Sequence, residues 1–199
     1  MPPTDLIALA AIMIWPVIPL FWIPVHCFPR FVRMLGLFTY LLPVLTWLPL
    51  TYVILLYHDV LLGRTIPLPY AVNGIGWVLI VAGLALQLWT LALLSLPGIM
   101  GMPEITPRVQ GRMVIVGPFG MVRHPTYLSH TLMFLGVFLL SGVIAVGAIT
   151  VLDLIVVNAV IIPLEERELV ERFGEEYEQY RRSVPNRIVP WGVRGKQGG

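Results

Sequence analysis

Charged residues are scarce in this chain. Asp, Glu, Lys and Arg make up 12% of the 199 residues, whereas a soluble domain of this length usually carries about a quarter. Hydrophobic residues make up 57%. So little polar surface cannot cover a globule in water, and the sequence therefore predicts an integral membrane protein. The net charge of +2 is small and its carriers are scattered, so no nucleic-acid partner is expected.

Cysteine and closely spaced histidine are also missing. The single cysteine, Cys27, excludes an intramolecular disulfide and any cysteine-rich metal site. The four histidines show no HExxH pattern or other close ligand spacing, so no metal site is predicted. No internal repeat is visible, which weakens a transporter built from repeated halves. The first five residues carry no basic residue, so no cleavable signal peptide is expected.

The sequence contains long apolar runs with few charged residues. A helix needs about 20 apolar residues to cross a ~30 Å hydrocarbon core. Three N-terminal runs are this long, and a shorter fourth run is joined to a fifth by Ser141-Gly142, which predicts a tight helical hairpin. The fourth run can extend back to Pro125, since proline suits a first helical turn. The sequence thus predicts an all-α protein with about five transmembrane helices, at residues 6–28, 34–57, 70–96, 128–140 and 143–164.

The basic residues predict the orientation. With five spans, 12 of the 13 Lys and Arg residues lie on one side of the membrane, and only Arg64 lies on the other. The basic side is expected to be cytoplasmic, which places the N-terminus outside and the C-terminal helical segment inside. We therefore expect residues 1–199 to form a single membrane domain, in which residues 1–96 are a three-helix N-terminal part. Gly74, Gly76 and Gly83 in the third span suit close helix packing.

Two stretches rich in charge, at residues 108–127 and 165–190, are expected on the cytoplasmic side. In the first, Arg123 and His124 precede Pro125, at a helix N-terminus that favours an anion. From these residues alone, a second interpretation stays open, in which Arg123 is an ordinary stop-transfer arginine and His124 is solvated. In the second, residues 164–173 predict an amphipathic helix ended by Gly174, and residues 175–182 predict another.

Glu165 and Glu166 follow the fifth span without a spacer. Neighbours on a helix point about 100° apart, so one carboxylate can face the bundle and the other water. A carboxylate at the edge of lipid needs a cation or a donor, which Arg123 or a cationic ligand would supply. A solvated helix start with Glu–Arg pairs, such as Glu168–Arg172 at i,i+4, is the alternative.

Other polar residues are isolated in the sequence. Asp153, within the fifth span, is either functional or a partner that holds two helices together. His130 and Gln87 are expected to be interhelical hydrogen-bond partners, and His26 and His58 to be bystanders.

The order of these motifs resembles the isoprenylcysteine carboxyl methyltransferase and phospholipid methyltransferase superfamily. The resemblance covers residues 106–190: the string GPFGMVRHPTYLSH, a hydrophobic hairpin, the string EERELVERFGEEYEQY and a proline-bounded tail. RHPxY followed ~40 residues later by EE and FGxxYxxY is a specific combination. Two positions depart from the family pattern, because Phe119 stands where tyrosine is usual and Ser129 where glycine is frequent.

The resemblance implies that residues 106–190 are a methyltransferase-like catalytic region that binds S-adenosylmethionine and yields S-adenosylhomocysteine. A lipophilic or prenylated acceptor would enter from the bilayer, among membrane lipids. Arg123 and Arg187 would orient this acceptor, expected first to be an isoprenylcysteine-type carboxylate. The residues implied in cofactor binding are Val116, Gly117, Phe119, His124, Pro125, Tyr127, Glu165, Glu166, Tyr177 and Tyr180.

Three alternatives stay open at this point. A phospholipid amine or a small thiol could replace the carboxylate as acceptor. A sterol-reductase-like enzyme would use NADPH, although no extra basic cluster clearly serves a 2′-phosphate. A non-catalytic transporter or lipid-binding protein would use Asp153 and Asn158 as part of a pathway.

Overall fold

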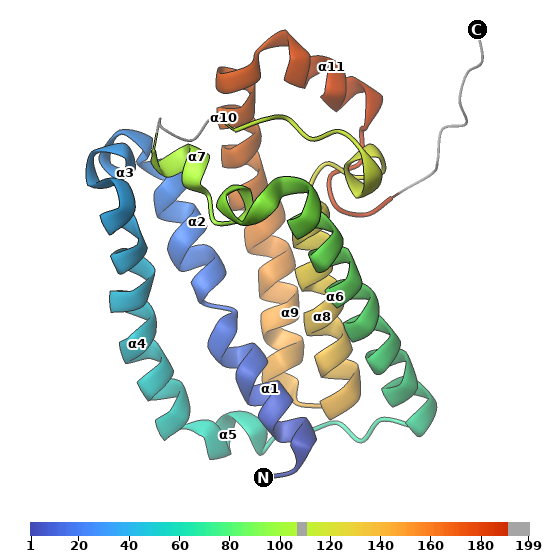
Figure 1. The fold of residues 1–199 in the computed structure, drawn as a ribbon. Coiled ribbons are helices and arrows are strands. Elements are labelled where there is room, and N and C mark those ends of the chain that lie inside the picture. Colours follow the sequence, from blue (N-terminus) through green and yellow to red (C-terminus); the bar gives the residue numbers. More distant parts are fainter. Residues whose placement is uncertain (107–110, 191–199) are drawn as a thin grey trace, which may run out of the picture.

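The computed structural model describes residues 1–106 and 111–190, and Arg108 of the first polar stretch lies outside these ranges. Helices dominate the described part of the chain (Figure 1). Short 3-10 helices are η1 (Gly36–Tyr40) and η2 (Gly117–Gly120), and η3 (Val157–Ile161) is a π-helix. The α-helices are α1 (Pro3–Ile14), α2 (Val17–Cys27), α3 (Pro29–Leu35), α4 (Leu41–Leu56), α5 (His58–Leu62), α6 (Tyr70–Ile99), α7 (Met102–Ile105), α8 (Pro125–Ser141), α9 (Ile144–Val156), α10 (Ile162–Phe173) and α11 (Glu175–Ser183).

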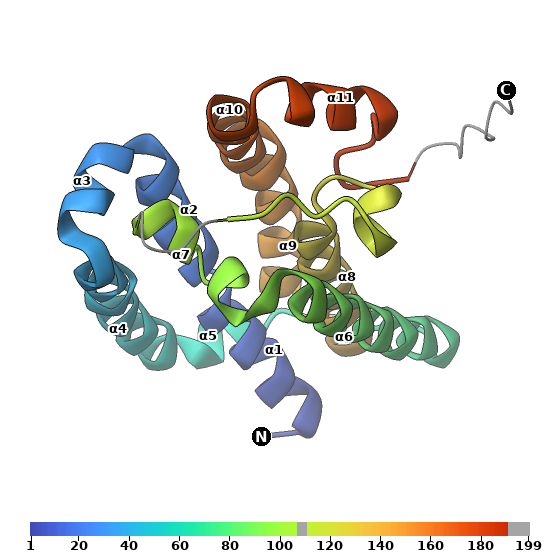
Figure 2. The same cartoon turned by 45° about the horizontal axis from the view of Figure 1, so that its top comes forward.

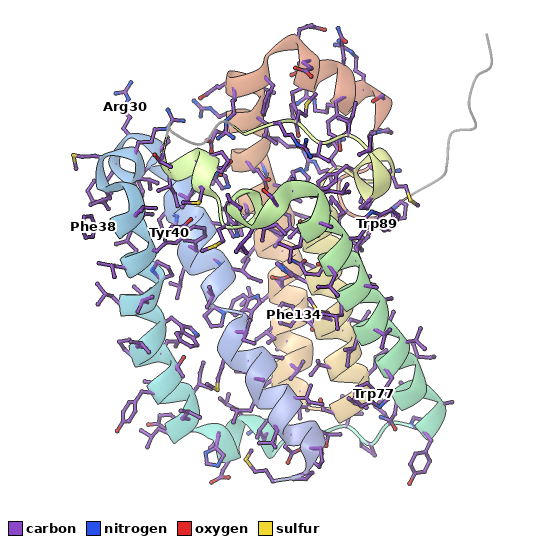
Figure 3. All side chains as sticks on the ribbon, in the orientation of Figure 1. Arg30, Phe38, Tyr40, Trp77, Trp89 and Phe134 are labelled. Carbon is purple, nitrogen blue, oxygen red and sulfur yellow. The ribbon has the colours of Figure 1, made fainter. Side chains whose placement is uncertain are left out.

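Five apolar helical segments run side by side (Figure 1). Four are long and apolar enough to cross a membrane: Pro3–Cys27, Pro29–Leu56, Tyr70–Ile105 and Ile144–Phe173. The fifth, α8, is a shorter apolar helix. Aromatic side chains such as Phe38, Trp77 and Trp89 are exposed on the outside, as expected where the surroundings are lipid (Figure 3). The predicted all-α membrane fold is confirmed, whereas its sidedness stays a prediction.

The predicted hairpin between α8 and α9 is also confirmed. Helix α8 begins at Pro125, three residues before the apolar run, and ends at Gly142, whose φ of 66° is left-handed. The backbone N–H of Ile66 donates to the carbonyl of Gly142 at 2.8 Å, and the N–H of Ile144 donates to that of Arg64 at 2.9 Å. The loop before α6 therefore holds the hairpin turn in place.

Helices α6 and α8 pack with their backbones in close approach. A Cβ added to Gly76 would lie 2.7 Å from the carbonyl oxygen of Gly136, and one added to Gly136 would lie 2.7 Å from that of Gly76. Only glycine leaves room for this approach, which is how apolar helices gain contact in a membrane. The packing prediction is confirmed for Gly76 and for Gly83, where an added Cβ would lie 2.8 Å from the carbonyl oxygen of Ser129. It is wrong for Gly74, which faces open space.

Polar contacts connect the N-terminal helices to the C-terminal half. Trp15, which directly follows α1, donates from Nε1 to Asp153 Oδ1 on α9 at 3.0 Å, so Asp153 joins α9 to the end of α1. His26 Nδ1 on α2 lies 2.8 Å from Glu168 Oε2 on α10. His26 was expected to be a bystander, and that prediction is wrong, because the chain brings together residues far apart in the sequence.

Helix α10 continues α9 past the ends of the other spans, and α11 turns back across them (Figures 1 and 2). Gly174, with a φ of 56°, makes the turn where the sequence predicted it. The segment that leads to η2 crosses beneath α11 (Figure 2). Both charge-rich stretches therefore meet at one end of the bundle.

Candidate active site

The start of α8 is fixed by the tail that follows α11. The backbone N–H of Arg123 donates to the carbonyl of Asn186, and that of His124 donates to the carbonyl of Arg187, both at 2.9 Å. Pro125 then takes the first helical position, where a missing N–H costs nothing. The two N–H groups before the helix are thus used by the tail, so they are not free to bind an anion.

Glu166 is buried at the centre of a group of ion pairs. Its Oε1 lies 2.8 Å from both Nε and Nη2 of Arg123 and 3.2 Å from Nε2 of His124. Nη1 of Arg123 donates to the carbonyl of Val184 at 2.7 Å, and Arg187 lies 3.7 Å from Glu166 Oε2. We call these residues, Arg123, His124, Glu166 and Arg187, the Glu166 cluster. It joins α8, α10 and the tail.

A cavity of about 490 Å³ lies beside the Glu166 cluster. Its walls come from α6, α7, α8, α10, α11 and the segment before η2. Its volume falls within the range of small-molecule sites. The predicted site residues that line it are Phe119, Arg123, His124, Tyr127, Glu165, Tyr177 and Tyr180.

The other predicted site residues do not line this cavity. Glu166 and Arg187 belong to the Glu166 cluster and do not line the cavity themselves. Val116 is 58% exposed, and Gly117 packs on α6, where an added Cβ would lie 3.1 Å from Leu93. Pro125 is buried in the first turn of α8. Cofactor binding by these residues stays a prediction, and the positions of Glu166 and Pro125 favour a structural role.

Several oxygens around the cavity are buried but unpaired. Oε2 of Glu165, Oε2 of Glu104 and the hydroxyl of Tyr177 have no hydrogen-bond partner within residues 1–106 and 111–190. A buried polar atom without a partner is costly, by about 1–3 kcal/mol. Such atoms are expected where a polar ligand completes the hydrogen bonding.

His124 lies between the two neighbouring carboxylates. Its Nδ1 is 3.5 Å from Glu165 Oε2, and its Nε2 is 3.2 Å from Glu166 Oε1. Burial alone lowers the pKa of His124, but the carboxylates of Glu165 and Glu166 outweigh it and raise that pKa above the ordinary 6.5. The two carboxylates therefore favour the protonated form of His124.

The two tyrosines of α11 cover the cavity. The Tyr180 hydroxyl donates to the carbonyl of Phe119 at 2.7 Å, which ties α11 to η2. Burial, with the Glu166 carboxylate, raises the pKa of Tyr177 and Tyr180 well above the ordinary value. Both hydroxyls therefore stay protonated and can donate.

The sequence analysis missed part of the site. Glu104 lines the cavity and pairs with Arg172 at 3.0 Å, and Arg172 also pairs with Glu168 at 2.7 Å, as its i,i+4 spacing predicted. An acid at the edge of the third apolar run was the available signal for Glu104. Gln87 accepts a hydrogen bond from Ser129 on α8, which confirms it as an interhelical partner. No group of acids, histidines or cysteine in the described residues could hold a metal ion.

Comparison with known proteins identifies the family. The profile of the phospholipid methyltransferase family matches residues 72–176, which is more than half of the chain. The chain belongs to the phospholipid methyltransferase family. The match begins in α6 and ends at the second residue of α11, so it contains the RHPxY and EE motifs and most of the cavity walls, but not Tyr177 or Tyr180. It includes neither α1–α5 nor the tail.

Two relatives of this family member have different activities. A delta(14)-sterol reductase of Mus musculus is 30% identical over 156 residues, which is 74% of this chain and 37% of that protein. A methanethiol S-methyltransferase of Bradyrhizobium diazoefficiens is 28% identical over 152 residues, which is 73% of this chain and 48% of that protein. The chain thus spans less than half the length of either relative. No solved structure matches it.

Proposed function

We propose that this membrane protein transfers a methyl group from S-adenosylmethionine to a lipophilic acceptor. The observation that carries the proposal is the buried carboxylate oxygen Oε2 of Glu165 at the cavity, which has no hydrogen-bond partner among the described residues, in a chain of the phospholipid methyltransferase family. A buried acid without a full set of partners suits a cationic ligand.

The residues of the cavity fit this cofactor. Its α-amino group matches Glu165, and its carboxylate matches His124, whose protonated form the neighbouring carboxylates favour. The aromatic rings of Phe119 and Tyr127 offer apolar surface for the adenosine, and the Tyr177 hydroxyl can donate a hydrogen bond. When bound, the cofactor supplies a methyl group on a sulfonium.

The protein's part in such a transfer is alignment and removal of water. Displacement at a methyl group needs its two reacting partners in line, which a preformed pocket supports. The ion pairs of the Glu166 cluster hold α8, α10 and the tail in fixed relation, so the walls of the cavity keep their spacing. Tyr177 and Tyr180 cover the cavity from α11 and keep water out.

The acceptor and the sidedness form part of the same proposal. A lipophilic acceptor reaches the cavity from the bilayer, and the candidates are an isoprenylcysteine-type carboxylate, a phospholipid amine and a thiol. The cavity end of the bundle faces the cytoplasm, because it carries nearly all of the basic residues. A reporter fused after Gly199 is expected to be cytoplasmic, and an external reporter would overturn this orientation.

Calorimetry in detergent tests the cofactor. The purified protein should bind S-adenosylhomocysteine, and Glu165→Gln should weaken binding at least about tenfold, since it removes a charge-assisted hydrogen bond of about 1.5–3 kcal/mol. Glu171→Gln is the matched control, because Glu171 lies on the same helix and pairs only with the exposed Arg167 among the described residues. A folded sample without detectable binding would sink the proposal.

A reductase is the second candidate, favoured by the sterol reductase among the relatives. NADPH would need free cations for its phosphates. Among the described lining residues, Arg123 and Arg172 are taken by carboxylates, which leaves the exposed Arg112. The unpaired lining oxygens belong to acids and a tyrosine, which suits a cation better than a polyphosphate. Binding of NADPH in place of S-adenosylhomocysteine would favour the reductase over the methyltransferase.

A further inference from the structure

His130 extends the polar lining of the cavity into the apolar body of α8. It lies one turn beyond Tyr127, and the two ring centroids are 6.3 Å apart in an edge-to-face arrangement. His124, Tyr127 and His130 follow at intervals of three residues on one face of the helix, and all three line the cavity. His130 is thus a third side chain of this row, further from the charged end.

The two histidines of this row have opposite surroundings. His124 has two carboxylates within 3.5 Å, whereas His130 forms no ion pair with any described acid, and its Nδ1 has no hydrogen-bond partner there. An unpaired charge is expensive at this depth, so the imidazole is neutral. A neutral imidazole has one ring nitrogen with a free lone pair, which can accept a proton.

The buried cations on the cavity wall are already neutralised. Arg123 is held by Glu166, and Arg172 is held by Glu104 and Glu168. His124, whose protonated form is favoured, is held by Glu165 and Glu166. A carboxylate acceptor would therefore meet no free buried cation on the described wall, and it would be repelled by Glu104 and Glu165. An uncharged acceptor that carries a proton to be removed suits these surroundings better.

We infer that His130 accepts the proton of a protic acceptor, a lipophilic thiol or amine, as the acceptor is methylated. The inference rests on the proposed function and narrows its acceptor. The acceptor's sulfur or nitrogen forms a bond to the methyl carbon, whose bond to the sulfonium breaks and leaves its electron pair on the cofactor sulfur. The acceptor's proton passes to the imidazole. The positive charge that the sulfonium brought into the cavity thereby moves to His130, and the total charge of the site does not change.

Three model acceptors distinguish a thiol, an amine and a carboxylate as the group that is methylated. Labelled S-adenosylmethionine is supplied with 1-octanethiol, octylamine or an S-farnesylcysteine derivative with a free carboxylate. Methylation of the thiol or the amine is expected, and the comparison of these two assays shows which protic group the enzyme methylates. Methylation of the carboxylate alone would overturn the inference.

Substitution of His130 tests the residue itself. His130→Asn keeps a polar group near the position of Nδ1 but cannot accept a proton, so kcat should fall by about 100-fold or more. The dissociation constant for S-adenosylhomocysteine should change less than about threefold. His58→Asn is the matched control, because α5, which begins at His58, lies at the other end of the bundle (Figure 1), and among the described residues His58 bonds only within its own turn. An unchanged kcat in a folded variant would exclude the proton-accepting role.

A second measurement does not depend on turnover or on a variant that folds. In wild-type protein labelled with 15N-histidine, 1-octanethiol or octylamine should shift the ring-nitrogen signals of His130 and leave those of His58 in place. No shift with either acceptor would overturn the inference. The failure of S-adenosylhomocysteine to bind would instead count against the proposed function, since acceptor contact with His130 is measured without it.

Discussion

Glu165 and Glu166 are neighbours on one helix with different surroundings. Glu166 is bonded by Arg123 and His124, with Arg187 close by, so its charge is fully matched inside the protein. Glu165 lines the cavity, and its Oε2 lacks a hydrogen bond within the described chain. The Glu166 cluster therefore holds the structure together, and the cavity wall keeps polar atoms available for a ligand. One step of about 100° around a helix separates the two roles.

The largest effect is expected from removing the charge of Glu166. Glu166→Gln leaves Arg123 buried without a counter-ion, and breaking a buried pair in this way costs about 3–5 kcal/mol. The melting temperature in detergent should fall by on the order of 10 °C. Glu165→Gln and Glu171→Gln should change it far less. If Glu166→Gln melted like the wild type while ligand affinity collapsed, the roles of the two glutamates would be reversed.

The difference between the two glutamates shows where sequence reasoning reached its limit. The sequence showed that Glu165 and Glu166 point in different directions, but it does not give the rotation of α10 against the bundle. Only packing decides that Glu165 faces the cavity. The pairs His26–Glu168 and Glu104–Arg172 join positions far apart in the chain, and no local pattern specifies such partners.

The fold was more predictable than the site, because its signals are local. The length of each apolar run set the helices, Ser141-Gly142 set the hairpin, and Gly174 set the turn before α11. The family motif also placed His124, Tyr127 and Tyr177 at one cavity. The same motif string ends at His130, but this residue was expected only as an interhelical hydrogen-bond partner, since a lone histidine in an apolar helix is ordinarily a packing residue.

A smaller effect is expected from pH, because His124 bridges the cluster and the cavity wall. The pKa of His124 is raised in the folded protein by Glu165 and Glu166, so folding favours its protonated form. This contribution is complete below the unfolded pKa of about 6.5 and is lost as pH rises through the raised folded pKa. The melting temperature of the ligand-free protein should therefore decline as the pH rises above about 6.5.

His124→Asn provides the control for this pH dependence. The variant has no imidazole to titrate, so its melting temperature should be lower at pH 6 and flatter across the same range. The effect should be smaller than that of Glu166→Gln, since Arg123 still matches the charge of Glu166. An equally steep decline in the variant would mean that another group is responsible.

The smallest effect on the melting temperature is expected from relief of backbone strain at a residue of the cavity wall. Ser95 lines the cavity and interrupts α6 with φ 64° and ψ 164°, a backbone conformation that residues other than glycine rarely adopt. Such strain costs about 1–3 kcal/mol, and glycine would relieve it at an entropic cost of about 0.5–1 kcal/mol. Ser95→Gly should therefore raise the melting temperature by a few degrees, on the order of 1 kcal/mol. Ser141→Gly, at the last residue of a regular helix, should lower it by a similar amount, and a loss in both variants would show that Ser95 is not strained.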